Sequence, residues 1–286
     1  MEFFATSLLN GLSFGMILFL IAAGLSIIVG VMGIINLSHG ALYMLGGYFG
    51  WMIAQRLGLN FWLAVFIGGL VAGLVGLFIE RAFLRRLYKQ MNEQVLLTFG
   101  FVYIITNICL WVWGGDAKVP FWDPALSGSF NLAGLLYPKT RIIVIAIGTV
   151  LAVFLWWLQN KTRVGAIIRA GMDDREMVTG LGINLARVSM LIFFLAAFIA
   201  GFAGVIGAQL WGVYSYQGLQ TLLFALIIII VGGIGSIQGA LAGALIIGIV
   251  DAFGRALFPQ LSMFFMFLVM IIILIAKPSG LLGRKI

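Results

Sequence analysis

The chain has 286 residues, of which 63% are hydrophobic and 9% are charged, and its formal net charge is +8. Soluble domains carry roughly 25% charged residues, so this composition excludes an ordinary water-soluble protein and indicates an integral membrane protein. Spanning segments must satisfy their own backbone hydrogen bonds, and the long apolar runs here do not alternate as barrel strands do, so we expect an all-α, polytopic helical bundle.

A bilayer core of about 30 Å needs roughly 20 apolar residues per helix. The sequence, interpreted as one membrane domain over 1–286, predicts apolar segments near 8–31, 41–54, 61–79, 95–113, 141–158, 188–210, 219–231, 240–256 and 261–276. The second and seventh are short and are interpreted as half-helices or re-entrant segments, so eight and nine passes both remain open. The first basic residue is Arg56, so the chain begins without the basic region of a cleavable signal, and we expect the first span to be retained.

Basic residues divide unequally between two sets of loops, which predicts the orientation rather than nucleic-acid binding. One set holds Arg81, Arg85, Arg86, Lys89, Lys161, Arg163, Arg169, Arg175, Arg187, Lys277, Arg284 and Lys285. The other set holds Arg56, Lys118, Lys139, Arg141 and Arg255. The positive-inside rule places the first set and the C-terminus in the cytoplasm. With nine passes, the N-terminus is then outside.

Two polar breaks interrupt the apolar runs and resemble each other. Residues 33–42 read GIINLSHGAL and residues 232–241 read GGIGSIQGAL, with matching residues at Gly33/Gly232, Ile35/Ile234, Gly40/Gly239, Ala41/Ala240 and Leu42/Leu241. Paired, glycine-interrupted segments in corresponding positions indicate a pathway at a repeat interface, with chance similarity in a Gly-rich chain as the alternative. The predicted path or gate residues are Asn36, Ser38, His39, Gly40, Gly232, Gly233, Gly235, Ser236, Gln238 and Gly239. The structural alternative is that their polar groups satisfy freed backbone groups at the breaks.

The sequence offers little for covalent or metal chemistry. His39 is the only histidine and Cys109 the only cysteine, which excludes a multi-histidine metal site and an internal disulfide. No GKS or GKT occurs, so the chain has no P-loop, and any nucleotide must be hydrolysed by another subunit. We therefore predict no catalytic residue, no metal and no cofactor bound by this chain.

Small residues recur every three or four positions in two predicted spans. Along a helix this spacing places them on one face and permits close helix contact in lipid. The predicted packing positions include Gly201 and Gly204 in one span and Gly243 in another.

Two longer polar stretches separate the spans. Segment 163–187 has apolar residues at helical spacing and glycine breaks, and Asp173 and Asp174 fit the start of a second short helix. Its Arg169 and Arg175 are expected to be free to pair with a partner, with a helix lying on lipid as the alternative. On the opposite side, 114–140 is expected to form an ordered loop or short amphipathic helices, either as a connector or as a contact surface for an external partner.

Three motifs together carry a family resemblance over essentially the whole chain: INLSHGALYMLGGY, RVGAIIRAGMDDREMVTGLGINLARV and VGGIGSIQGALAGALIIG. The chain resembles the membrane permease subunit of bacterial branched-chain amino acid ABC importers. The resemblance implies that 163–187 is the segment that docks on the ATPase. The residues it assigns to this contact are Gly165, Arg169, Ala170, Gly171, Glu176, Gly180 and Gly182, with Asp173 and Asp174 where the family often has Asn or Asp.

The resemblance also implies the partners and the location. It implies two cytoplasmic ATPase subunits that hold the ATP and Mg²⁺, a second and usually different permease subunit, an external solute-binding protein, and the bacterial inner membrane. Close relatives carry urea, short amides or aromatic acids, so these solutes are alternatives to branched-chain amino acids. A secondary carrier or channel without an ATPase is the main rival, and a membrane enzyme or a purely structural subunit explains the chain less well.

Overall fold

The structure is a computed structural model that describes residues 2–33, 35–88, 90–120, 127–132 and 134–283. Its helices are α1 (Glu2–Met32), α2 (His39–Trp51), α3 (Phe61–Ala82), α4 (Met91–Trp113), α5 (Lys139–Lys161), α6 (Arg163–Asp173), α7 (Arg175–Gly180), α8 (Leu185–Trp211), α9 (Gln217–Gly232), α10 (Ile237–Leu257) and α11 (Ser262–Ala276). A π-helical turn, Met52–Arg56, extends α2, and 3₁₀ turns lie at Leu84–Leu87 and Pro259–Leu261.

Seven of the described helical segments are long and apolar enough to cross a membrane: α1, α3, α4, α5, α8, α10, and α11 together with the 3₁₀ turn before it (Pro259–Ala276, 18 residues). The other two apolar helices, α2 and α9, have 13 and 16 residues and are the two segments that the sequence predicts to be short. The chain is therefore a multi-pass membrane protein with a helical fold, as expected from its composition.

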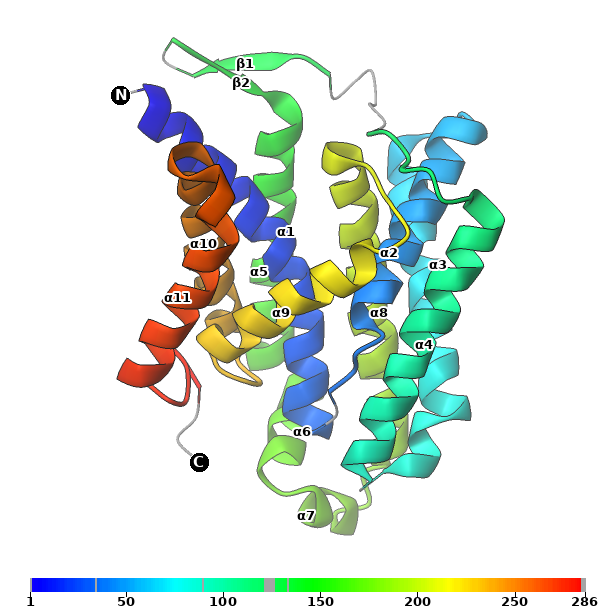
Figure 1. The fold of residues 1–286 in the computed structure, drawn as a ribbon. Coiled ribbons are helices and arrows are strands. Elements are labelled where there is room, and N and C mark those ends of the chain that lie inside the picture. The colour runs from blue at the N-terminus through cyan, green and yellow to red at the C-terminus, as the bar shows by residue number, and fades with distance from the viewer. Residues whose placement is uncertain (1, 34, 89, 121–126, 133, 284–286) are drawn as a thin grey trace.

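The two ends of the chain lie at opposite ends of the bundle (Figure 1). The N-terminal end lies beside a β-hairpin, and the C-terminal end lies toward α6 and α7; these are called the hairpin end and the α7 end below. Segment 33–60 must cross the bundle, since α1 ends at the α7 end and α3 begins at the hairpin end (Figure 1). Segment 212–236 also crosses the bundle, since α8 ends at the hairpin end and α10 begins toward the α7 end (Figure 1). Helices α2 and α9 therefore belong to interrupted membrane crossings and are not re-entrant.

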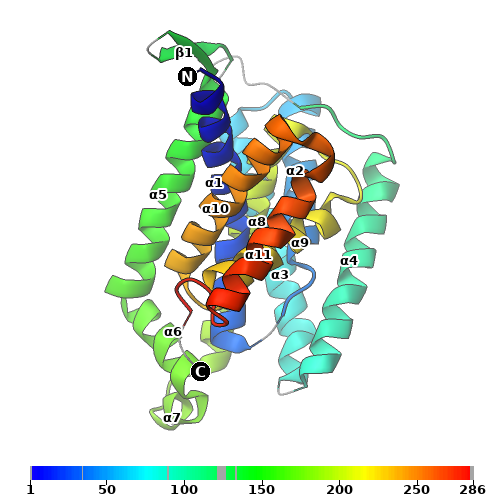
Figure 2. The same cartoon turned by 60° about the vertical axis from the view of Figure 1, so that its left-hand side comes forward.

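The centre of the bundle is formed by α1 and α8, which are the most deeply buried of the long helices. Helix α8 packs along α2 and α3, and α1 packs along α10. Figure 2 shows α5 and α4 at opposite edges, with α11 in front of the central helices. Helix α9 crosses this centre obliquely and contacts α2, α1 and α10 (Figure 1). It thereby joins the two sides of the bundle at mid-depth.

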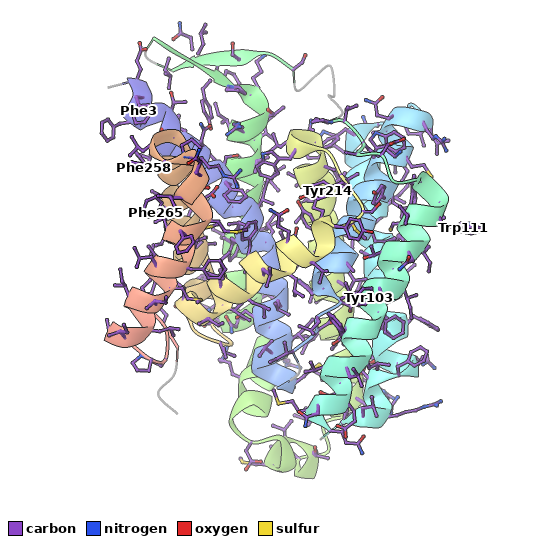
Figure 3. All side chains as sticks on the ribbon, viewed as in Figure 1. Phe3, Tyr103, Trp111, Tyr214, Phe258 and Phe265 are labelled. Atoms are coloured by element: carbon purple, nitrogen blue, oxygen red, sulfur yellow. The ribbon has the colours of Figure 1, made fainter. Side chains whose placement is uncertain are left out.

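Large apolar side chains cover the outside of the bundle. Trp111 and Tyr103 point away from α4, and Phe258 and Phe265 lie on the opposite side (Figure 3). The Trp111 side chain is 88% exposed. In a soluble protein such a surface is an aggregation hazard, whereas in a bilayer it is in contact with lipid or with another membrane subunit.

Close helix contact in the centre depends on glycine. A Cβ added to Gly204 of α8 would overlap the Tyr43 carbonyl oxygen of α2, and one on Gly201 would overlap the Ala72 side chain of α3. On α10, a Cβ on Gly243 would lie 2.9 Å from the Ile228 carbonyl oxygen of α9. Dispersion and main-chain contact replace the hydrophobic effect between helices in lipid, so these short separations hold the bundle together.

The described part of the 114–140 stretch contains a β-hairpin where the sequence predicted a loop or short helices. Strands β1 (Ser129–Leu132) and β2 (Leu135–Pro138) pair antiparallel, with Ser129 opposite Pro138. Gly134 has φ 95° and donates its N–H to Asn131 Oδ1 at 2.8 Å, which closes the turn. The predicted stretch thus keeps its place between spans but differs in its local structure, and its residues 121–126 lie outside the described residues.

Candidate functional site

Segment 163–187 forms the two short helices α6 and α7, which project from the α7 end of the bundle (Figure 1). Thr162 caps α6, because its Oγ1 accepts a hydrogen bond from Gly165 N at 3.1 Å and donates to the Leu158 carbonyl at 2.5 Å. A Cβ on Gly165 would overlap the carbonyl oxygens of Leu158 and Gln159. Only glycine therefore lets α6 fold back so closely onto the end of α5.

Arg169 is bound within the chain. Its Nη1 donates a hydrogen bond to the main-chain carbonyl of Gln159 in the last turn of α5. Carbonyl groups at a helix C-terminus lack intrahelical partners and carry the negative end of the helix dipole, so a guanidinium group is a favourable partner there. The sequence predicted that Arg169 is free to pair with a partner; in this structure one nitrogen of its guanidinium group contacts the end of α5, and Arg169 braces the α5–α6 turn.

Helix α7 presents an apolar tip. Asp174 begins the helix as the sequence predicts, with its Oδ1 accepting a hydrogen bond from Met177 N at 2.9 Å. Met177 and Leu181 are 64% and 69% exposed, and we call this pair the α7 tip. Gly182 then has φ 79°, a conformation that lets the chain turn away toward α8.

The other residues assigned to this contact are placed as follows. Ala170 and Gly180 are exposed, and Gly171 is buried. The side chains of Asp173 and Glu176 lie outside the described residues, so only the helices that carry them are placed.

The break before α2 satisfies its backbone groups with side chains. Asn36 Oδ1 accepts hydrogen bonds from the N–H and the hydroxyl of Ser38, at 3.1 and 2.6 Å. Thr98 of α4 accepts another from Leu37 N at 3.2 Å. Asn36 and Ser38 are both buried. Their first function in the structure is thus to replace the helical hydrogen bonds that the break removes.

His39 and Gly40 join α2 to its neighbours at mid-depth. The His39 Nε2 lies 3.0 Å from the Ile21 carbonyl oxygen of α1, and the imidazole is fully buried. A carbonyl oxygen only accepts, so Nε2 carries the proton. A Cβ on Gly40 would overlap the Gly218 carbonyl oxygen, so the first turns of α2 and α9 are in direct contact.

The turn between α9 and α10 contains the second polar break. Gly233 and Gly235 have φ values of 100° and 79°, and Ser236 Oγ caps α10 by accepting from Gly239 N at 2.9 Å. A Cβ on Gly239 would overlap the Gly232 carbonyl oxygen. Both predicted breaks are therefore helix-starting turns with glycine contacts, although the first lies before a half-helix and the second before a full span.

The C-terminal segment closes over this turn. The N–H groups of Leu281 and Leu282 donate to the carbonyls of Val231 and Gly232, at 2.8 and 2.9 Å. These are two of the carbonyls that the end of α9 leaves without an intrahelical partner. The turn is thereby fixed from the α7 end by the last described part of the chain.

Gln159 connects the α9–α10 turn with α6. Its Nε2 donates to the Gly235 carbonyl at 3.4 Å, and its own main-chain carbonyl accepts from Arg169. One residue of α5 therefore contacts both the projecting segment and the second polar break. These two contacts connect α6 with the turn between α9 and α10.

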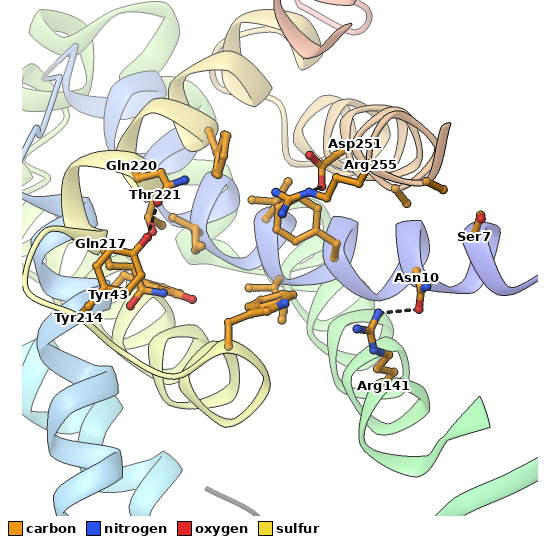
Figure 4. A pocket seen from close by; sticks show the side chains of 18 residues that line it. Ser7, Asn10, Tyr43, Arg141, Tyr214, Gln217, Gln220, Thr221, Asp251 and Arg255 are labelled. Carbon is orange, nitrogen blue, oxygen red and sulfur yellow. Dashed lines mark hydrogen bonds and ion pairs between the residues drawn. The ribbon is translucent and has the colours of Figure 1, made fainter. Parts of the chain in front are cut away.

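A cavity of about 500 Å³ lies between α1, α2, α5, α8, α9 and α10 (Figure 4). It follows α1 from Ser7 down to Ile21, so it occupies the half of the bundle nearer the hairpin end. Its apolar wall is formed by Phe14, Ile17, Leu18, Ile21 and Phe224. The volume and the mixed lining are those of a pocket for a small molecule.

Charged and polar groups line the rest of the cavity (Figure 4). Asp251 is 3% exposed, and its Oδ2 accepts a hydrogen bond from Arg255 Nε at 2.7 Å. The two residues are four positions apart on α10, the spacing at which side chains meet on one face of a helix. Asn10 Oδ1 accepts from Arg141 Nη1 at 2.5 Å and from the Tyr137 hydroxyl at 3.0 Å. Burial raises the pKa of Tyr137, against the opposing effect of Arg141, so the hydroxyl stays protonated and donates.

None of the predicted path residues lines this cavity. His39 lies directly behind it, because its hydrogen-bond partner Ile21 is on the cavity wall. Gly232, Gly235 and Ser236 lie in the turn on the α7 side, and Gln238 is exposed. Sequence reasoning missed the cavity, although the Asp251–Arg255 pair within an apolar span was a signal for it.

The fold and these features define a class: a multi-pass helical membrane transport protein with broken crossings at mid-depth and a solute-sized cavity in one half. Residues 7–274 match the family described as "Branched-chain amino acid transport system / permease component". The chain belongs to that family.

Individual relatives agree with this assignment. The chain is 32% identical to the high-affinity branched-chain amino acid transport system permease protein LivH of Escherichia coli K12, over 99% of this chain and 96% of LivH. It is 30% identical to BraD, the protein of the same description from Pseudomonas aeruginosa, over 97% of this chain and 95% of BraD. It is also 27% identical to the E. coli permease protein LivM, over 93% of this chain and 68% of LivM.

Among solved structures, the chain is similar to PsaBC from Streptococcus pneumoniae in complex with Fab. The TM-score is 0.53 with 12% identity, over 96% of this chain and 91% of the other. At that identity the similarity supports the fold alone.

Proposed function

We propose that this chain is one permease subunit of an ATP-driven importer of branched-chain amino acids. Family membership over almost the whole length supports the solute class, since LivH and BraD are named as high-affinity permease proteins for these amino acids. The similarity to both LivH and LivM, two different E. coli permease proteins, supports a second, related permease as partner.

The α7 tip carries the proposal of an ATPase partner. Met177 lies in α7 and Leu181 directly follows it; both are exposed. Helix α7 projects beyond the rest of the bundle (Figure 1). Apolar side chains beyond the ends of the spans gain by being covered by another protein. We place one ATPase subunit on each permease there, in the cytoplasm, holding ATP and Mg²⁺. The membrane is then the bacterial inner membrane, with the C-terminus inside.

The cycle follows from this placement. An external solute-binding protein delivers the amino acid at the hairpin end, where the cavity lies. Closure of the ATPases on ATP moves α6, and Arg169 and Gln159 pass the movement to the α9–α10 turn. The contact between the first turns of α2 and α9 forms the barrier below the cavity, and its rearrangement opens the route to the cytoplasm.

The test is ATP hydrolysis by the complete complex in proteoliposomes, with the solute-binding protein present. Leucine, isoleucine and valine should each stimulate hydrolysis and accumulate inside, whereas urea, acetamide and benzoate should not. Stimulation by one of those three solutes but by no branched-chain amino acid would overturn the solute class. Leucine uptake that continues without ATPase subunits would overturn the ATP-driven mechanism.

A further inference from the structure

Helix α9 exposes polar side chains at mid-depth. Figure 1 shows α9 in front of the central helices, with its first turn at mid-depth in the bundle. Tyr216, immediately before the helix, is 69% exposed, and Gln220, one turn further on, is exposed as well. The Gln220 Oε1 accepts a hydrogen bond from the Tyr214 hydroxyl, whereas the Gln220 amide N–H groups have no acceptor among the described residues. Acyl chains offer no acceptor, so lipid is an unfavourable neighbour for this surface.

The neighbouring helix α4 also exposes polar side chains midway along its length. Helix α4 lies beside the first turns of α9 and contacts them (Figure 1). Tyr103 is 52% exposed and lies near the middle of α4, on the side nearer α9 (Figure 3). Asn107 follows four positions later on the same side, where it is exposed and donates to the Tyr103 main-chain carbonyl at 2.8 Å. Tyrosine favours the two interfaces of a membrane, so a tyrosine exposed at mid-span indicates a protein neighbour.

Two other helices at the edge of the bundle, α5 and α11, have outer surfaces of a different kind. After Ser262, α11 consists of apolar residues alone, and its Ile272 and Ile275 are 55% and 79% exposed. On α5 the exposed Thr149 donates its hydroxyl to the Ile145 carbonyl at 2.8 Å, within its own helix. These surfaces suit acyl chains, whereas the outer surface of α4 and α9 does not.

The cavity opens along the surface of α9. Trp211, Gln220 and Arg255 line the cavity and are also exposed (Figure 4). The exposed fraction is 41% for Trp211 and 59% for the Arg255 side chain, and fractions of this size are not those of an enclosed cavity. The chain by itself therefore leaves one side of the cavity uncovered at membrane depth. A cavity with a charged pair in its wall needs a protein wall on that side.

We propose that the second permease packs on this surface and covers the open side of the cavity. The α4–α9 face, defined by Tyr103, Asn107, Tyr214, Tyr216 and Gln220, offers hydroxyl and amide groups that both donate and accept. Such groups hydrogen-bond between helices in lipid, so the partner that suits them is a membrane subunit with amide and hydroxyl side chains at the same depth. A related permease of the same fold, packed about a near-twofold axis, meets this face with its own corresponding face. The inference rests on the proposed function and adds to it the surface on which the two permeases meet.

The experiment is photo-cross-linking in membrane vesicles that contain the complete complex. The photoreactive residue p-benzoylphenylalanine is placed either at Leu223 of α9 or at Ile272 of α11, two apolar residues that are 52% and 55% exposed. Leu223 lies three positions after Gln220 and therefore on the same side of α9. Light should link position 223 to the second permease, whereas position 272 should give no link to either permease. Different tags on the second permease and on a second copy of this chain identify each product.

The inference is overturned if position 223 gives no link to the second permease in an assembled complex. It is also overturned if position 223 links only to the second copy of this chain, or if position 272 links to the second permease and position 223 does not.

A pair of variants tests the polar groups themselves. Gln220→Leu removes the amide group, whereas the control, Thr149→Val, removes a hydroxyl group from the surface of α5 that suits lipid. Recovery of the second permease with the tagged chain in mild detergent should fall by about threefold in Gln220→Leu and stay unchanged in Thr149→Val. Equal recovery from the two variants would overturn the role of the Gln220 amide in the interface.

The outcome is separable from the proposed function. Leucine-stimulated ATP hydrolysis by the wild-type complex, combined with a link to the second permease from position 272 and none from position 223, would overturn this inference and leave the proposed function standing. Absence of stimulation by every branched-chain amino acid would overturn the proposed function itself.

Discussion

The imidazole Nε2 of His39 lies 3.0 Å from the main-chain carbonyl oxygen of Ile21, and Ile21 is part of the cavity wall. The only histidine of the chain therefore joins the start of the half-helix α2 to the central helix α1, immediately behind the cavity. The bond therefore ties the start of α2 to the helix that forms the wall of the cavity.

Two replacements of His39 should distinguish the effect of its hydrogen bond from the effect of its side-chain volume. His39→Gln keeps an N–H donor for the Ile21 carbonyl, whereas His39→Leu keeps an apolar side chain of similar size but has no donor. Loss of this buried bond should lower stability by about 1 kcal/mol, and leucine uptake should fall more in His39→Leu than in His39→Gln. Thermal stability and uptake in proteoliposomes measure this. Equal behaviour of the two variants would show that the bond has no role.

Gly239 tests the close contact at the second polar break. An added Cβ would overlap the Gly232 carbonyl oxygen, so Gly239→Ala should destabilise the complex by about 1–3 kcal/mol and reduce uptake. Gly100 is the matched control, since its Cβ would meet no atom within 4 Å and it also lies within a helix. Thermal unfolding of both variants in detergent is the measurement. Wild-type stability of Gly239→Ala would contradict the close packing.

Arg169 tests transmission from α6. Arg169→Ala removes the bond to the Gln159 carbonyl and should lower leucine-stimulated ATP hydrolysis by about fivefold, while basal hydrolysis and leucine binding by the external protein remain. Arg163→Ala, at the exposed start of the same helix, removes the same charge and serves as control. If leucine stimulation of ATP hydrolysis falls equally in the two variants, the loss is caused by the reduced positive charge of α6 and not by the missing bond between Arg169 and α5.

Local features were predictable from the sequence because they depend on neighbouring residues. The two short spans, the Asp174 cap and the Asp251–Arg255 pair each follow from length, helix dipole or i, i+4 spacing. The hairpin was not predicted, since its turn depends on Asn131 and Gly134 within a stretch without alternation.

Features that join distant segments were not predictable. The cavity brings Asn10, Gln217 and Asp251 together from three helices, and nothing in their local sequence indicates that they face one space. The internal contact of Arg169 was not predicted, because its acceptor, the Gln159 carbonyl, is ten residues away across a helix turn whose geometry Gly165 sets.

The central claim is that the α7 tip docks on an ATPase, and site-directed cross-linking tests it most directly. Cys109 is buried, so a Cys109→Ser background allows Leu181→Cys to be the only reactive thiol, with Leu136→Cys on the hairpin as control. In membrane vesicles containing the whole complex, a short bifunctional reagent should link Leu181→Cys to an ATPase subunit, and should not link Leu136→Cys to it. A Leu181→Cys thiol that reacts freely with a lipid-phase reagent but never cross-links to the ATPase would contradict the account.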